Sequence, residues 1–122
     1  MSDAQPSVSA RNTAKPPEHL LRQIGLRYVS VSELTIRRRR RRAGCIFVNG
    51  NGRNLRDDRI LYRLKRLAVP PAYEDVLYAA DPHAHLQAVG RDAAGRAQYR
   101  YHPDWEKVRE LRKARRLARL AE

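Results

Sequence analysis

The segment from residue 90 to residue 102, GRDAAGRAQYRYH, holds the densest group of side chains that could recognise another molecule. Gln98 carries an amide that suits the N6 and N7 atoms of adenine, and arginine suits the O6 and N7 atoms of guanine. If this part is a strand, Gln98 and Arg100 point to one face while Tyr99 and Tyr101 point to the other. A β-ribbon fits the major groove of DNA, so base recognition is one interpretation. Half-buried strand tyrosines with a solvated arginine rim are the other, and the pattern leaves both open.

A run of six arginines is the second candidate, and it consists of Arg37, Arg38, Arg39, Arg40, Arg41 and Arg42. Adjacent like charges repel one another and prefer water, so the run predicts a loop or a flexible edge. Contact with phosphates is the interpretation that we favour. A solubilising segment or an import-like signal is the alternative.

The charge of the whole chain points the same way. The 122 residues include 26 Lys and Arg, 22 of them Arg, against 13 Asp and Glu, which gives a formal charge of +13. The planar guanidinium matches phosphate and guanine, so the excess predicts a polyanionic partner, with nucleic acid first. The sequence has neither an apolar run long enough to span a bilayer nor the apolar core of a secretory signal. We therefore expect a soluble cytoplasmic protein.

Residues typical of metal or nucleophilic chemistry are sparse. Cys45 is the single cysteine, which excludes an internal disulfide and any zinc site with two cysteines, and we expect it to be a small buried residue. His83, His85 and His102 lack partner spacing for a metal, so hydrogen-bonded structural histidines are the better interpretation. The carboxylates lie at positions typical of helix caps and turns, which gives little support to a general acid–base pair, and no serine or cysteine nucleophile motif is present. We predict no metal and no cofactor.

The elements that must position these side chains follow from periodicity and turn residues. We predict an α+β fold, a small antiparallel sheet of about five strands flanked by helices. Residues 1–16 form a disordered tail, 17–104 an α+β domain, and 105–122 a basic C-terminal helix. The first expected helix is 17–24. The second is capped by Asp57 or Asp58 and ends near Ala68, and its solvent face carries Arg59, Arg63 and Arg66. The expected strands are 26–29, a hairpin of 44–49 and 53–55 around an Asn-Gly turn, then 75–80, 85–90 and 98–101.

The C-terminal stretch reads as an amphipathic helix with one apolar half and one arginine-rich half. Trp105 and Leu120 fall outside the apolar arc, so we place Trp105 in the preceding turn and expect Leu120 to be frayed or covered by a partner. No capping residue follows the helix before Glu122. We therefore expect the chain to lead toward a further domain.

Several motifs follow one another in an order that is more specific than any one of them alone. LRYVS at residues 26–30, the arginine run, the helix up to Ala68 with VPPAYEDV after it, HLQAVGRD at 85–92 and GRAQYRYHPDW at 95–105 follow one another. Over about residues 25–122 this order resembles the N-terminal region of the poxvirus-like bacterial type IB DNA topoisomerases.

The resemblance implies a domain that clamps one side of duplex DNA, while a separate catalytic domain relaxes supercoils through a phosphotyrosyl intermediate without ATP or obligatory metal. It implies base contacts from Gln98 and Tyr99. It implies backbone contacts from the tyrosine and arginines of the same region and from the arginine run, namely Tyr101, Arg91, Arg96, Arg100 and Arg37 to Arg42. Ala97 departs from the family pattern, which usually has Lys or Arg there, so one phosphate contact would be weaker.

The expected partners are duplex DNA and the catalytic domain of the same protein, with no membrane and a monomeric, nucleoid-associated state. This segment alone would bind DNA but would not cleave it. The alternative is a free-standing basic module that binds RNA or the ribosome, which an arginine-rich hairpin and a basic helix would also suit. A metal-dependent enzyme ranks third, because its ligand set is absent.

Overall fold

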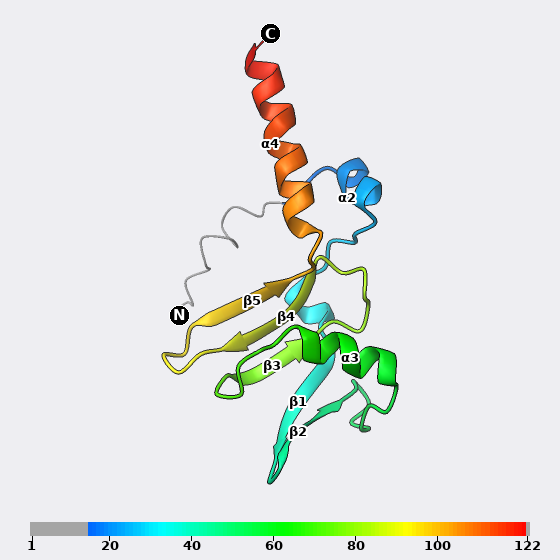
Figure 1. Ribbon diagram of the computed structural model, residues 1–122, viewed down its shortest axis with the longest axis vertical. Helices are drawn as coiled ribbons and strands as arrows, with labels where there is room; N and C mark the ends of the chain where they lie inside the picture. Colours follow the sequence, from blue (N-terminus) through cyan, green and yellow to red (C-terminus); the bar gives the residue numbers. More distant parts are fainter. Residues whose placement is uncertain (1–14, 122) are drawn as a thin grey trace.

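The computed structural model describes residues 15–121. Within them the chain forms, in order, α2 (Glu18–Ile24), the 3-10 helix η1 (Val31–Glu33), β1 (Ile36–Arg41), β2 (Gly44–Val48), α3 (Asp58–Arg66), β3 (Glu74–Tyr78), β4 (Leu86–Arg91), β5 (Ala97–Tyr101) and α4 (Trp105–Ala121). The strands make a five-stranded antiparallel sheet in the order β2-β1-β3-β4-β5. Helix α3 lies against the sheet and α4 projects beyond it (Figure 1). The predicted fold class is confirmed.

The predicted helices form where their end signals stand. Asp57 is the N-cap of α3, and its carboxylate accepts hydrogen bonds from the backbone N–H groups of Arg59 and Ile60. Gly25 ends α2 in the left-handed conformation, with φ 87°, where a residue with a side chain would be strained. Strands β3, β4 and β5 occupy the three predicted segments within a residue or two at each end. Most of the predicted disordered tail, residues 1–14, lies outside the described part of the chain.

The prediction that the arginine run is a loop or flexible edge is wrong. Residues 36–41 form strand β1, which pairs with β2 along its whole length and with β3 only at Ile36 and Arg37. The turn that joins β1 to β2 reaches Gly44, at φ 105°. Together the two strands make a hairpin that extends past the end of β3, at the bottom of Figure 1. Alternation places successive arginines on opposite faces, so the repulsion between neighbours does not prevent a strand.

Two other predicted strands and one predicted burial are corrected. Residues 53–55 return beside β2 but form only an isolated bridge, from Val48 to Asn54. Residues 26–29 likewise make one parallel bridge, between Arg27 and Ala84, because η1 follows too soon for a longer ladder. Cys45 is exposed instead of buried, since it lies on the part of the β1–β2 hairpin that extends past the core.

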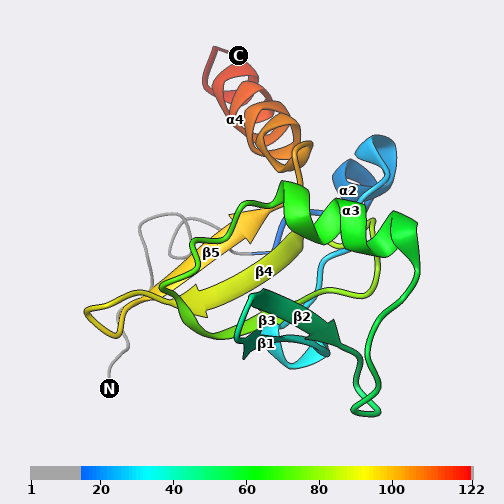
Figure 2. The same cartoon turned by 60° about the horizontal axis from the view of Figure 1, so that its bottom comes forward.

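The sheet has two different faces. Residues directly opposite each other in an antiparallel pair share a face, and one such row runs from Ile36 through Tyr78 and Ala88 to Arg100. Helix α3 covers this row (Figure 2) and adds Leu64 to it. The buried members of this cluster are Ile36, Phe47, Leu64, Val76, Tyr78 and Ala88. This face is therefore the main core of the domain.

Helices α2 and α4 pack on each other at the end of the sheet. Trp105, which we placed in a turn, instead begins α4 and is only 2% exposed against Leu20 and Leu21 of α2. Toward the end of α4, Leu117 is 56% exposed and Leu120 is 79% exposed among the described residues. None of the helices in residues 15–121 combines the length and the apolar character needed to cross a membrane.

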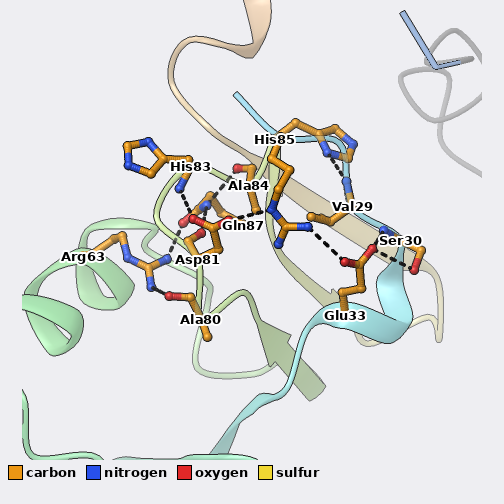
Figure 3. A network of polar contacts seen from close by, with 11 residues as sticks. Val29, Ser30, Glu33, Arg63, Ala80, Asp81, His83, Ala84, His85 and Gln87 are labelled. Atoms are coloured by element: carbon orange, nitrogen blue, oxygen red, sulfur yellow. Dashed lines mark hydrogen bonds and ion pairs between the residues drawn. The ribbon is translucent and has the colours of Figure 1, made fainter. Parts of the chain in front are cut away.

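A buried polar network holds α3 to the sheet (Figure 3). Arg63, predicted on the solvent face of its helix, instead donates to the carbonyl oxygens of Ala79 and Ala80 at 3.0 Å and to the side-chain oxygen of Gln87. Gln87 is 1% exposed and donates to the carbonyl of Ala84 at 2.9 Å. Burial lowers the pKa of Arg63, and the nearby charge of Asp81 opposes that shift. The network satisfies carbonyls that no strand pairs.

A second part of the network fixes the segment before η1. The backbone N–H of Val29 donates to Nδ1 of His85 at 3.1 Å. His85 is 3% exposed, and its ring stacks on Tyr28 with centroids 4.2 Å apart. Burial lowers the pKa of His85 to about 4, so the ring stays neutral at physiological pH. The expectation of a structural, hydrogen-bonded histidine is confirmed here.

Replacing Arg63 with methionine should lower the free energy of unfolding by about 2–4 kcal/mol, because the side-chain oxygen of Gln87 and the carbonyl of Ala79, both partly buried, lose their charged donor, as does the carbonyl of Ala80. Arg59, exposed on the same helix, is the matched control, and Arg59→Met should change stability by less than about 0.5 kcal/mol. Urea denaturation of both variants measures this. Equal stability of the two variants would mean that Arg63 lies on the solvent face of α3 and does not stabilise the sheet.

The neutral His85 also makes stability depend on pH. Between about pH 6.5 and pH 4 the unfolded chain binds a proton at this residue and the folded chain does not, so the free energy of unfolding should fall by up to about 3 kcal/mol as the pH drops. Above pH 6.5 this group adds no pH dependence. His85→Asn keeps an acceptor for Val29 and should flatten that fall, whereas His83→Asn, at an exposed position, should not. Urea titrations at several pH values test this, and an unchanged fall in His85→Asn would contradict it.

Candidate nucleic-acid interface

The face of the sheet opposite α3 carries a second cross-strand row. It crosses all five strands through Val48, Arg37, Leu77, Val89 and Tyr99. Val48 is buried, whereas Leu77, Val89 and Tyr99 are half-buried and Arg37 is exposed. The segment with η1 covers only part of this face, through Val29 and Leu34. We call this row, together with Arg39, Arg41 and Arg91 on the same side of the sheet, the open face.

The alternation of β1 divides the arginine run. Arg37, Arg39 and Arg41 share the open face, because each is two residues from the next. A hollow of about 540 Å³ lies beside them and is lined by Arg37, Arg39 and Leu77. Arg42 lies in the turn at the tip of the hairpin and is exposed. The open-face arginines therefore keep their guanidinium groups at the surface.

Arg38 and Arg40 lie on the other face and donate to backbone carbonyls of the domain, Arg38 from a half-buried position and Arg40 from an exposed one. Arg38 donates to the carbonyls of Val69 and Pro70 at 2.9 Å and of Tyr73 at 3.0 Å. Arg40 donates to the carbonyl of Pro71 at 3.0 Å. The chain from Leu67 to Tyr73, between α3 and β3, thus depends on β1 for donors.

Arg100 of β5 reaches the same connecting segment from the opposite edge of the sheet. Its Nε donates to the carbonyl of Leu67 at 3.1 Å. Sequence reasoning missed this role because each donor lies about thirty residues from its acceptor. The only local signal was the pair Pro70 and Pro71, which carry carbonyls but no N–H groups to help form a regular turn.

Asp92 organises the tip of the β4–β5 hairpin. Its Oδ1 accepts the backbone N–H groups of Ala94 and Arg96, both at 2.9 Å, and its Oδ2 accepts Nε of Arg96 at 3.1 Å and Nε2 of Gln98 at 3.0 Å. The N–H of Arg96, more than the other donors, holds the pKa of the Asp92 carboxyl below its usual value. Gly95 supplies the positive φ, 79°, that the turn needs. Sequence reasoning treated Asp92 only as a turn residue.

The two tyrosines of β5 differ in their surroundings. Tyr99 belongs to the open face, and its ring lies 6.2 Å from that of Tyr101, nearly parallel to it. Tyr101 also stacks on Trp105, with centroids 5.9 Å apart, at the junction of the sheet with α4. Both tyrosines are half-buried, Tyr101 at the junction with α4 and Tyr99 in the row of the open face.

The structure therefore brings some of the predicted contact residues together and separates others. On the open face lie Arg37, Arg39, Arg41, Arg91 and Tyr99. Around the tip of the β4–β5 hairpin lie Arg91, Arg96 and Gln98, where Arg91 also donates to the carbonyl of Gly95 at 3.2 Å. By the alternation of the strands, the opposite face holds Arg38, Arg40, Gln98 and Arg100. A single flat surface cannot contact all of them.

Metal-ligating side chains do not gather in residues 15–121, where no group of three His, Cys, Asp or Glu could hold an ion. His102, one of the three histidines considered above, accepts the backbone N–H of Asp104 at Nδ1, at 3.0 Å. The open face instead combines guanidinium groups with an aromatic ring and aliphatic side chains. Such a surface can neutralise phosphates and contact flat rings.

Comparison with known proteins gives two matches. Residues 44–92 match the family described as bacterial DNA topoisomerase IB, N-terminal domain. A stretch of 39 residues is 49% identical to DNA topoisomerase 1B of Acanthamoeba polyphaga mimivirus, and it covers 32% of this chain but 12% of the viral protein. The family match extends from β2 to the end of β4, so strands β1 and β5 lie outside it.

Both matches point to one class of protein, the type IB DNA topoisomerases. The resemblance seen in the order of the motifs is confirmed, since residues 44–92 are similar to the N-terminal domain of bacterial type IB DNA topoisomerases.

The division of the arginine run can be tested without any ligand. Arg38→Met should lower the free energy of unfolding by about 1–3 kcal/mol, since three carbonyls lose a charged donor. Arg39→Met, the neighbouring position on the open face, should stay within about 0.5 kcal/mol of the unsubstituted chain. Thermal and urea unfolding of the pair checks this. A larger loss in Arg39→Met would show that the two faces are assigned the wrong way round.

Proposed function

We propose that this domain binds duplex DNA, and that it does so as the clamping part of a type IB topoisomerase. The observation that carries the proposal is the open face, where Arg37, Arg39 and Arg41 stand beside the half-buried row that ends in Tyr99. Phosphate contacts supply most of the affinity of such proteins for DNA and position them on it. The similarity of residues 44–92 to a DNA topoisomerase domain supports DNA as the polyanion, in place of the RNA or ribosome alternative.

Two elements of the domain would contact the DNA. The β4–β5 hairpin is a two-stranded ribbon of the width that a major groove admits. Near its tip it carries Tyr99 on the open face and Gln98 on the opposite face, so a ribbon inserted edgewise would bring both side chains to base edges. Arg91 and Arg96 flank its tip, where they would meet phosphates. The arginines of β1 lie at the other end of the same row and would hold the backbone there.

The wider activity follows from the class of protein. A catalytic domain of the same protein would supply the nucleophilic tyrosine and relax supercoils through a phosphotyrosyl bond, without ATP. The domain described here would add affinity and position the duplex, as a monomer associated with the nucleoid in the cytoplasm. Cleavage needs a nucleophile in line with phosphorus, cations and a proton donor together, and we predict no covalent DNA adduct from this chain alone.

Replacing Arg37, Arg39 and Arg41 together with alanine should weaken DNA binding and its salt dependence. We expect log K to fall against log salt with a slope of roughly −4 to −5 for the unsubstituted chain, and the triple variant to lose about 2–3 units of that slope. Sequence preference should not change, because phosphate contacts carry no base information. Fluorescence anisotropy with a labelled duplex at several salt concentrations measures both quantities.

The matched control removes the same charge elsewhere. Arg59, Lys65 and Arg66 are exposed on α3, which packs on the opposite face of the sheet, so their triple alanine variant should keep most of the slope. Equal losses in the two triple variants would mean that net charge alone drives binding. A flat salt response of the unsubstituted chain, or a preference for structured RNA in direct competition, would overturn the proposed function itself.

A further inference from the structure

Asp92 and Gln98 form a contact that chemistry allows in only one orientation. The carboxylate Oδ2 lies 3.0 Å from the amide nitrogen of Gln98. A carboxylate can accept but not donate, and an amide donates only through nitrogen, so the NH₂ end of Gln98 must face Asp92. Asp92 is itself fixed by two backbone N–H groups and is 13% exposed. The carbonyl oxygen of Gln98 is therefore directed away from the turn.

The remaining groups of that amide form a defined pattern. One N–H goes to Asp92, which leaves the carbonyl oxygen as an acceptor and the second N–H as a donor. Adenine presents a donor at N6 and an acceptor at N7 in the major groove, and so complements this pair. Guanine presents two acceptors, O6 and N7, and one of them would face the carbonyl oxygen of Gln98.

We propose that Asp92 is a positioning residue that locks the amide of Gln98 and thereby makes the β4–β5 hairpin select adenine over guanine at one base pair. This inference rests on the proposed DNA-binding function and adds the direction of its sequence preference. Asp92 would touch no base. It would act through the orientation of Gln98, while its bonds to Ala94 and Arg96 maintain the turn.

Asp92→Asn is a nearly isosteric test that reverses the lock. The Oδ1 of asparagine can keep both backbone bonds of the turn, whereas its NH₂ replaces the acceptor that faces both Gln98 and Nε of Arg96. The Arg96 side chain is 74% exposed and can turn to water, and a lost phosphate contact there would weaken all duplexes alike. The amide of Gln98 should then turn over, with its oxygen inward and its two N–H donors outward, a pattern that suits guanine. Asp75→Asn is the charge-matched control, because Asp75 is an exposed carboxylate near the same hairpin, 4.0 Å from Arg91.

The experiment selects bound duplexes from a pool with a randomised central block, using the full chain and three variants. The unsubstituted chain should enrich adenine at a position whose preference disappears in Gln98→Ala. Asp92→Asn should change that position to guanine, by about fivefold or more in relative affinity, and Asp75→Asn should leave it at adenine. The inference would be overturned if Asp92→Asn kept adenine, or if no position depended on Gln98. Salt-dependent binding of the pool would in that case still support the proposed function. Failure of the pool to bind at all would overturn both.

A second measurement needs no variant and so cannot fail through misfolding. At the position selected by the unsubstituted chain, adenine is replaced by purine, which lacks the 6-amino group but keeps N7. The carbonyl oxygen of Gln98 then loses its donor, and affinity should fall by about fivefold or more. Unchanged affinity would show that this oxygen does not face the base.

Discussion

The two-residue period of strand β1 is the constraint on which the rest of the domain depends. It sends Arg38 and Arg40 to the face beneath α3 and leaves Arg37, Arg39 and Arg41 on the open face. Arg38 and Arg40 supply donors to a connecting segment in which Pro70 and Pro71 have carbonyls but no backbone N–H groups. Without those donors the half-buried carbonyls of Val69 and Tyr73 would lose a charged partner, and the segment between α3 and β3 would be held less firmly against the core.

Arginine thus serves in this molecule both as internal framework and as surface charge. Arg63 does from α3 what Arg38 does from β1: each reaches carbonyl oxygens of a loop that no strand pairs. Planar guanidinium groups suit this work, because several donors in a fixed fork can meet several oxygens at once. A net charge of +13 therefore overstates what is available to a polyanion. Exposed arginines lie on the open face, at the tips of the two hairpins and along α4, and further ones, such as Arg59 and Arg66, lie on the outer side of α3.

The elements governed by local signals could be predicted, and those governed by distant partners could not. Asp57 with the apolar spacing after it predicted α3, and short β-rich runs between turns predicted β3 to β5. The arginine run failed as a loop because the repulsion of neighbours is a local rule, whereas its compensation comes from Phe47 and Val48 across β2 and from carbonyls about thirty residues away. The division between Tyr99 and Tyr101 likewise needed the position of α4, which no spacing within β5 reveals.

The central claim is that alternate arginines of β1 face the DNA. Its most direct test is a titration of the ¹⁵N-labelled chain with an unlabelled duplex, observed through the Nε–H resonances of the arginines. The resonances of Arg37, Arg39 and Arg41 should shift with DNA, while those of Arg38 and Arg100 should stay in place because their carbonyl partners remain inside the domain. Shifts of equal size at odd and even positions, or shifts confined to Arg38 and Arg100, would contradict the claim.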